Sequence, residues 1–181
     1  LEAPPLVSIL RRWLIELELG KQRAIAIGTY GQGDDGHSGI TPTYFSFHVK
    51  KWRETGETTY DGHSLVIAEQ LDFGTFPLFL EGPVRLMKSV NKTEAERIYL
   101  SVRNSPLHDK DLGMYTVSAS LQGQSLDMGR MMAFTPGWLE NQSVWMHMSY
   151  KFYLGIIRNG LFDIFFDEMR NGGMLPFMNA D

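Results

Sequence analysis

The first part of the chain has the hydrophobic spacing of an amphipathic helix. Its large apolar residues fall at i, i+3, i+4, i+7, i+8 and i+11, and they are Leu6, Ile9, Leu10, Trp13, Leu14 and Leu17. We expect this helix to end at Gly20, where a C-terminal glycine belongs. Residues 28–39 carry five glycines in twelve positions and are predicted to form a loop.

Strict alternation of apolar and polar residues predicts half-buried strands. It occurs in residues 44–50 and again in residues 115–121. Asp61-Gly62 is a turn signal, so residues 64–71 are expected to return as a strand. The aromatic, nearly uncharged stretch 73–80 is expected to be buried and to be closed by the following Glu-Gly-Pro.

Three further helices are predicted. Thr93 and Glu96 have capping-box spacing and suggest a helix that ends near Arg103. Residues 141–158 have the strongest helical pattern, and residues 161–169 form its partner helix. The apolar face of the longer helix is marked by Trp145, Met148, Phe152 and Ile156.

Composition removes several classes of protein. With 43% hydrophobic and 21% charged residues, bulk disorder is excluded. A net charge of −4 argues against a nucleic-acid binder, and the absence of cysteine excludes disulfides, thiolate zinc sites and cysteine nucleophiles. No apolar run is long enough for a membrane segment. The chain starts at Leu1 without a leader and stops abruptly, so we expect an internal piece of a longer, cytoplasmic protein.

A glycine-rich motif in residues 31–36 matches the letters of a dinucleotide-binding loop. A strand rather than a helix is expected to follow it, and Asp34 and Asp35 would repel phosphates, so that function is rejected. The two aspartates are instead candidates for receiving saccharide hydroxyls, with a solvated loop as the alternative. The histidines of the first third of the chain lack metal-ligand spacing, so no metal is expected.

The most informative stretch is residues 129–147. It contains a turn at Pro136-Gly137, a loop, and an expected helix start at Asn141. A loop that leads into a helix N-terminus supplies free backbone N–H groups and the positive end of the helix dipole. The pattern therefore suits the binding of an anion.

Side chains of the same stretch suit a saccharide and an oxyanion. Trp138 offers a flat apolar face of the kind on which sugars stack, and Glu140 lies two residues further on. Arg130 and His147 are donors suited to an oxyanion. The pattern alone also allows His147 to be a buried, hydrogen-bonded histidine of the helix.

The stretch resembles the inverting glycoside phosphorylases of the cellobiose-phosphorylase type, glycoside hydrolase family 94. The matching positions are Gly129, Arg130, Phe134, Pro136, Gly137, Glu140, Asn141, Val144, Trp145 and His147. Residues 42–45, 78–85 and 138–141 are similar to segments of the beta-1,2-glucan phosphorylase branch. The resemblance implies a mainly α fold, part of an (α/α)6 barrel with inserted β-hairpin segments, in which residues 1–181 form one fragment.

The resemblance also implies roles for residues. His147, together with Arg130, would hold phosphate, and Glu140 would contact the glycosyl unit beside Trp138 and Asn141. The sequence departs from the family pattern where a glycine is replaced by Gln142. No aspartate-rich turn is found for the general acid, which is therefore expected before Leu1, so the catalytic residue is not assigned.

The function expected from the resemblance is inverting phosphorolysis of beta-linked glucosides. Inorganic phosphate would be the co-substrate, and no cofactor is expected. The alternatives are an inverting hydrolase or transglycosylase, and a non-catalytic saccharide-binding or structural piece. The isolated fragment is expected to be inactive. Its expected partners are an oligosaccharide and the remainder of the parent chain, with a homodimer left open.

Overall fold

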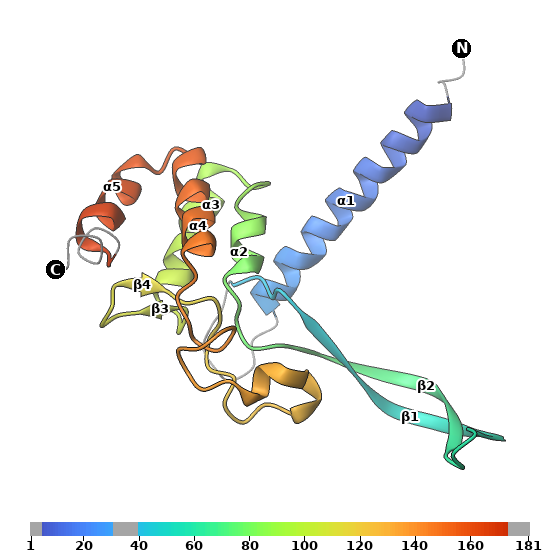
Figure 1. Cartoon of the computed structure of the whole chain (residues 1–181). Helices are drawn as coiled ribbons and strands as arrows, with labels where there is room; N and C mark the ends of the chain where they lie inside the picture. The colour runs from blue at the N-terminus through green and yellow to red at the C-terminus, as the bar shows by residue number, and fades with distance from the viewer. Residues whose placement is uncertain (1–4, 31–39, 174–181) are drawn as a thin grey trace. The chain divides into compact units, whose positions relative to one another are not determined.

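The computed structural model describes residues 5–30 and 40–173, and the chain folds into two compact units (Figure 1). One unit is the insertion Tyr44–Phe76, and the other comprises the chain on either side of it. The elements in order are α1 (Pro5–Tyr30), β1 (Phe45–Thr58), β2 (Ser64–Thr75), α2 (Glu81–Leu86), α3 (Lys92–Arg103), β3 (His108–Asp109), β4 (Met114–Tyr115), a 3-10 helix (Leu126–Ala133), α4 (Met146–Arg158) and α5 (Phe162–Asn171).

The fold is mixed α/β, and the prediction of a mainly α fold within an (α/α)6 barrel is wrong. The described residues form two separate two-stranded antiparallel sheets, β1–β2 and β3–β4, beside the helices. The longer sheet belongs to the insertion, and the shorter one joins irregular loops between α3 and α4. The long polar and glycine-containing connections around the 3-10 helix leave no continuous succession of helical hairpins. None of the described helices combines the length and apolar composition that a bilayer span requires.

The core of the larger unit is built around α4, which packs against α2, α3 and α5. Phe152 of α4 is fully buried, and its ring meets that of Tyr115 edge-on at a centroid distance of 4.8 Å. Gly155 allows α2 to approach closely, because a Cβ atom at this position would lie 3.3 Å from Cβ of Met87. The predicted apolar face of α4 is therefore confirmed as the face that is packed into the core.

The predicted helices after residue 90 exist, but their starting residues differ. The α3 helix is capped by Asn91, whose side chain accepts a hydrogen bond from the Glu94 N–H at 3.0 Å, rather than by the predicted box at Thr93. The α4 helix begins at Met146 instead of residue 141. The predicted helix at 161–169 is confirmed as α5. Sequence patterns thus located these helices, whereas local hydrogen bonds decided where α3 begins.

The strand predicted at 115–121 is largely wrong. Only Tyr115 of this segment lies in a named strand, and Ser118 forms an isolated bridge with Phe79. The alternation does not correspond to an exposed and a buried face, because the polar residues Thr116 and Ser118 are buried as well. Their hydroxyls are satisfied inside the unit, where Thr116 donates to the Leu107 carbonyl at 3.2 Å.

The insertion is the predicted hairpin, and it is longer than expected. The β1 and β2 strands pair antiparallel with several register shifts, and the chain turns at Asp61-Gly62, where Gly62 has φ +89°. The strand at 44–50 was expected to be half-buried, but Phe47 is 66% exposed and Val49 is 51% exposed. The alternating pattern therefore predicted this strand correctly and its burial incorrectly.

Two predicted boundaries on either side of the hairpin are wrong. The first helix continues through Gly20 to Tyr30, since glycine weakens a helix without ending it. Residues 81–83 were expected to end the buried stretch, but they form the first turn of α2. A Cβ atom on Gly82 would lie 2.5 Å from the Thr41 carbonyl oxygen. This close approach explains a glycine inside a short helix. Leu80 before it is fully buried, as predicted for the end of the aromatic stretch.

A buried carboxylate ties three parts of the larger unit together. Glu168 of α5 is 1% exposed, and its Oε1 accepts hydrogen bonds from the Tyr99 hydroxyl at 2.6 Å and from the Tyr115 hydroxyl at 2.8 Å. Arg103 forms an ion pair with the same oxygen. Because a buried charge is costly without partners, these three donors make the burial of the carboxylate tolerable. They join α3, β4 and α5.

Replacement of Tyr115 by phenylalanine should lower the free energy of unfolding by about 1.5–3 kcal/mol, the usual value of a hydrogen bond to a charged group. Tyr153 provides a matched control, because its hydroxyl is buried without a hydrogen-bond partner in the described residues. Tyr153→Phe should therefore leave stability unchanged or raise it. Urea unfolding of both variants tests this, and equal losses of stability would contradict the assignment.

Stability should also fall in alkali. Burial, followed by the negative charge of Glu168, raises the pKa of Tyr115 and of Tyr153 above the ordinary value. The folded state therefore keeps both phenols protonated where the unfolded chain has begun to ionise. The stabilising contribution is complete below pH about 10 and is lost as the pH rises through the folded-state pKa. The urea midpoint, followed from pH 9 upward, should decrease less steeply in Tyr153→Phe; an identical slope would contradict this.

Candidate functional site

The loop before α4 is shaped by a tight turn. The Trp138 N–H donates to the Thr135 carbonyl at 3.0 Å, and the Gly137 N–H donates to the Asn141 carbonyl at 2.8 Å. Gly137 has φ +89°, a conformation that glycine adopts without steric cost. The predicted turn at Pro136-Gly137 is thus confirmed, and its glycine has a conformational reason.

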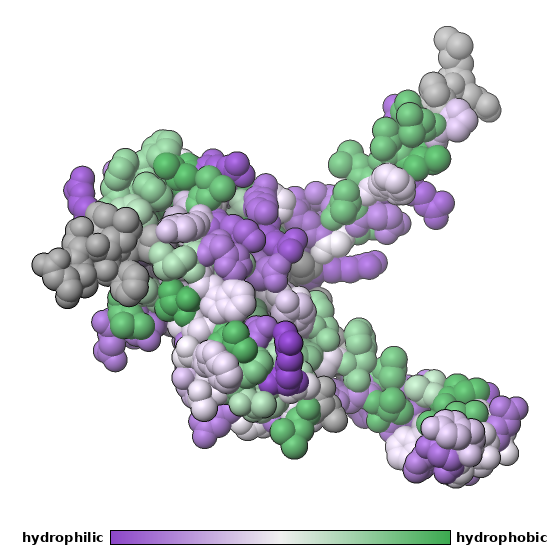
Figure 2. Space-filling model, viewed as in Figure 1, coloured by the Kyte–Doolittle hydropathy of each residue, from purple (hydrophilic) through white to green (hydrophobic). Residues whose placement is uncertain are grey.

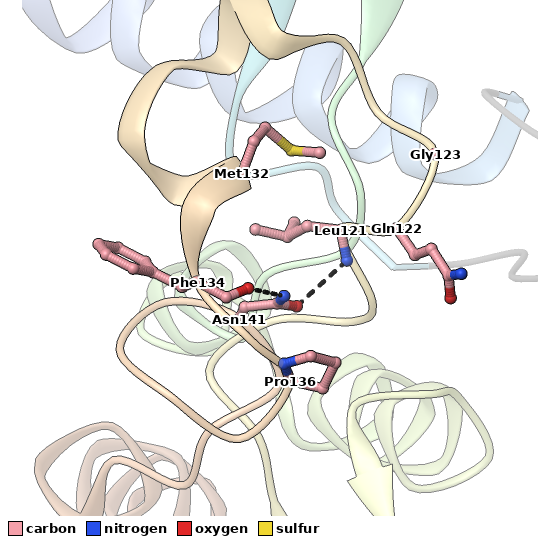
Figure 3. A pocket seen from close by; sticks show the side chains of 7 residues that line it. All are labelled: Leu121, Gln122, Gly123, Met132, Phe134, Pro136 and Asn141. Carbon is pink, nitrogen blue, oxygen red and sulfur yellow. Dashed lines mark hydrogen bonds between the residues drawn. The ribbon is translucent and has the colours of Figure 1, made fainter.

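Asn141 holds the two sides of this loop together. Its Oδ1 accepts from the Leu121 N–H at 3.3 Å, and its Nδ2 donates to the Phe134 carbonyl at 2.8 Å (Figure 3). The residue is 6% exposed. We expected Asn141 to start a helix and to contact the saccharide, but its amide is occupied by backbone groups. Its observed role is to position the loop.

Leu139 and Gln142 have φ values of +47° and +53°, which is unusual for residues with side chains. The Leu139 carbonyl accepts a hydrogen bond from the Trp145 Nε1 at 2.9 Å. The Gln142 N–H donates to the Ser118 hydroxyl at 3.2 Å, and this hydroxyl donates to the Glu140 carbonyl at 2.6 Å. These long-range contacts fix the strained backbone around Glu140, so this side chain projects from a rigid support.

Arg130 and Glu140 lie together, as expected for parts of one site. The Arg130 Nη2 and the Glu140 Oε1 are 3.9 Å apart. The Arg130 side chain is 82% exposed, so its guanidinium retains donors for a ligand. The Glu140 Oε2 is buried and has no hydrogen-bond partner within the described residues. The Glu140 side chain as a whole is 28% exposed, so part of it can be reached by a ligand.

The indole of Trp138, two residues before Glu140, is exposed to solvent. Its side chain is 57% exposed, and its ring packs edge-on against Phe134 at a centroid distance of 5.3 Å. The contact with Phe134 orients the indole and leaves most of its surface free. Trp138 therefore fits the predicted stacking role geometrically.

His147 lies in a different setting from the one predicted. It is exposed in the first turn of α4, not two turns into a helix, and its ring packs against Trp145 at 5.3 Å. The alternative of a buried histidine is therefore wrong. The described contacts pair Arg130 with Glu140 and place His147 against Trp145, so the two proposed phosphate ligands are not joined by a direct contact.

A mostly apolar pocket of about 380 Å³ lies next to the loop (Figure 3). Among the predicted site residues, it is lined by Asn141 alone, and Phe134 lines it while also packing on Trp138. Its lining residues are Leu121, Gln122, Gly123, Met132, Phe134, Pro136 and Asn141. No sequence pattern predicted this pocket, because Leu121 and Met132 come together only through the fold.

Two predicted saccharide ligands, Asp34 and Asp35, lie outside the described residues. Within residues 5–30 and 40–173, no three histidine, aspartate or glutamate side chains gather as a metal site would require. Sequence reasoning missed Ser118, whose hydroxyl positions Glu140 from a segment more than twenty residues away. No local pattern could have revealed that contact.

Comparisons with known proteins do not place the chain in a family. No protein-family model matches it, and neither a curated protein nor a solved structure matches it either. The resemblance of residues 129–147 to glycoside phosphorylases therefore remains a prediction.

Removal of the Asn141 amide should loosen the loop. Asn141→Ala loses two buried hydrogen bonds and should lower the free energy of unfolding by about 1–3 kcal/mol. It should also speed hydrogen exchange of the Leu121 amide, which loses its acceptor. Gln122→Ala is the control, since its exposed side chain lines the same pocket. Unchanged exchange at Leu121 in Asn141→Ala would show that the amide is not what holds the loop.

Proposed function

We propose that the chain is part of a carbohydrate-active protein and that its loop at residues 129–147 holds a saccharide beside an oxyanion, as in an inverting glycoside phosphorylase. The proposal rests on one observation above all. An exposed indole and a carboxylate project from one hydrogen-bonded loop, and an exposed guanidinium from the 3-10 helix before it lies 3.9 Å from that carboxylate. The resemblance of the loop sequence to phosphorylases supports the same assignment.

The three side chains have complementary chemistry toward a sugar. Trp138 would stack on the apolar C–H face of a pyranose ring, since the indole is largely exposed. The Glu140 carboxylate, whose side chain is 28% exposed, would accept a hydrogen bond from a sugar hydroxyl. Arg130 would donate to an oxyanion such as phosphate with the guanidinium donors that Glu140 does not use.

In phosphorolysis, a phosphate oxygen forms a bond to the anomeric carbon while the glycosidic C–O bond breaks. The leaving oxygen takes a proton from a carboxylic acid, and no protein base is required. The residues of this loop would bind and orient the two reactants. The proton donor is expected in another part of the parent protein, so the chain is proposed to bind without turnover.

Hydrolysis is a second candidate, and the free oxygen of Glu140 favours it. A carboxylate beside the sugar could activate water, which would make phosphate unnecessary. In the parent protein, the two functions differ in their response to phosphate. Sugar release that requires inorganic phosphate supports the phosphorylase, whereas equal release without phosphate supports the hydrolase.

The binding proposal is tested with a pair of tryptophan variants. Trp138→Ala should weaken the binding of beta-glucan oligosaccharides at least about tenfold in titration calorimetry, since a central aromatic contact often dominates affinity. Trp52→Ala is a closely matched control, because Trp52 lies in the insertion and is also 57% exposed. Equal loss in both variants, or no binding by the unaltered chain, would contradict the proposal.

The oxyanion part is tested separately with inorganic phosphate. Arg130→Gln should abolish phosphate binding that is measured in the presence of oligosaccharide, while oligosaccharide binding alone should be retained. Arg85→Gln serves as the control, because Arg85 is exposed and forms an ion pair with Glu81 on α2. Phosphate binding that survives in Arg130→Gln would remove Arg130 from the proposed site.

A further inference from the structure

Helix α1 carries a stripe of large apolar side chains that are exposed to solvent. Hydrophobic residues are visible along the helix in Figure 2. Their exposed fractions run from 48% for Ile9 to 72% for Leu17. Contiguous exposed apolar surface of this kind marks an interaction site. The stripe consists of Leu6, Ile9, Leu10, Trp13, Leu14 and Leu17.

Charged residues border the stripe on both sides in a regular order. A helix turns by about 100° per residue, which places Arg11 and Glu18 along one edge of the stripe and Arg12 and Glu16 along the other. On each edge, the arginine precedes the glutamate. The midpoint of each pair falls at or next to Leu14, in the C-terminal half of the stripe. Along both edges, the charge therefore changes from positive to negative at the same level of the helix.

This order distinguishes the two ways in which identical helices can pack. In an antiparallel pair centred on Leu14, each edge meets the same edge of the other copy in reverse direction. Arg11 then faces Glu18 of the second copy, and Arg12 faces Glu16 of the second copy. In a parallel pair, opposite edges meet at the same height, so that Arg11 faces Arg12. Flanking charges set the orientation of helix pairs, and here they favour the antiparallel arrangement.

The same register gives a role to the glycine inside the helix. In an antiparallel pair centred near Leu14, Ile9 of one copy lies opposite Gly20 of the other. A Cβ atom added to Gly20 would meet nothing within 4 Å, so the surface there is open. A small residue opposite a large one lets two helices approach closely. Glu18 also pairs with Lys21 in its own helix at 2.9 Å.

We propose that the apolar stripe of α1 binds a second copy of this chain as an antiparallel helix pair centred on Leu14. The inference is independent of the proposed saccharide function, because it involves none of the residues of the loop at 129–147. The partner is identified by the self-complementary charges and by the match of Ile9 to Gly20.

Charge reversal tests the partner. The double variants Arg11→Glu/Arg12→Glu and Glu16→Arg/Glu18→Arg should each raise the dissociation constant of the dimer at least about tenfold, because like charges then meet on both edges. An equimolar mixture of the two variants should associate, since each supplies the charges that the other lacks. Sedimentation equilibrium measures all three samples and the unaltered chain.

Cysteine cross-linking tests the orientation, and the chain is well suited to it because it has no cysteine. Ile9→Cys and Gly20→Cys are prepared as separate chains and oxidised alone and mixed. The antiparallel pair predicts a disulfide in the mixture and little in either chain alone. A parallel pair predicts the opposite. Circular dichroism of each variant checks that the helix is retained.

Three results would overturn the proposal. The unaltered chain could be monomeric at every concentration reached, in which case another partner or none covers the stripe. The charge-reversed chains could dimerise as tightly as the unaltered chain. Each single-cysteine chain could cross-link with itself rather than with the other.

Discussion

The larger unit depends on one buried charge. The Glu168 carboxylate is buried, and it accepts hydrogen bonds from the hydroxyls of Tyr99 and Tyr115 and pairs with the guanidinium of Arg103. Those donors come from α3 and β4, and the carboxylate comes from α5. Helix α4 is enclosed by the same arrangement, with Phe152 packed against the Tyr115 ring. The helix whose start supports the candidate loop is therefore held in place by an electrostatic requirement of the core.

The candidate loop is also held by buried polar side chains, through hydrogen bonds between neutral groups. Asn141 and Ser118 supply hydrogen bonds to backbone groups that no helix or sheet would satisfy. The polar side chains inside the loop build its shape. Asn141 is therefore a supporting residue, whereas the side chains of Trp138 and Arg130 are largely exposed.

The sequence predicted those features that depend on neighbours along the chain. A capping-box spacing located α3, apolar periodicity located α4, and alternation followed by a turn signal located the hairpin. It did not predict the end of α1, because Gly20 only weakens a helix, or the start of α4, because bonds to Leu139 and Ser118 hold residues 139–145 outside it. In the site, the exposure of Trp138 fits its expected role, whereas the occupation of the Asn141 amide could not be foreseen. Its partners, Phe134 and Leu121, are seven and twenty residues away.

The way in which the hairpin joins the larger unit has an evolutionary consequence. The Thr43 hydroxyl donates to the Phe79 carbonyl at 3.1 Å and accepts from the Gly82 N–H at 2.8 Å, so the chain leaves and re-enters the larger unit at neighbouring points. A short bridge could join these points. The β1–β2 hairpin between them is thus a modular insertion. Its length could change in evolution, or the hairpin could be lost, without disturbing the packing around Glu168.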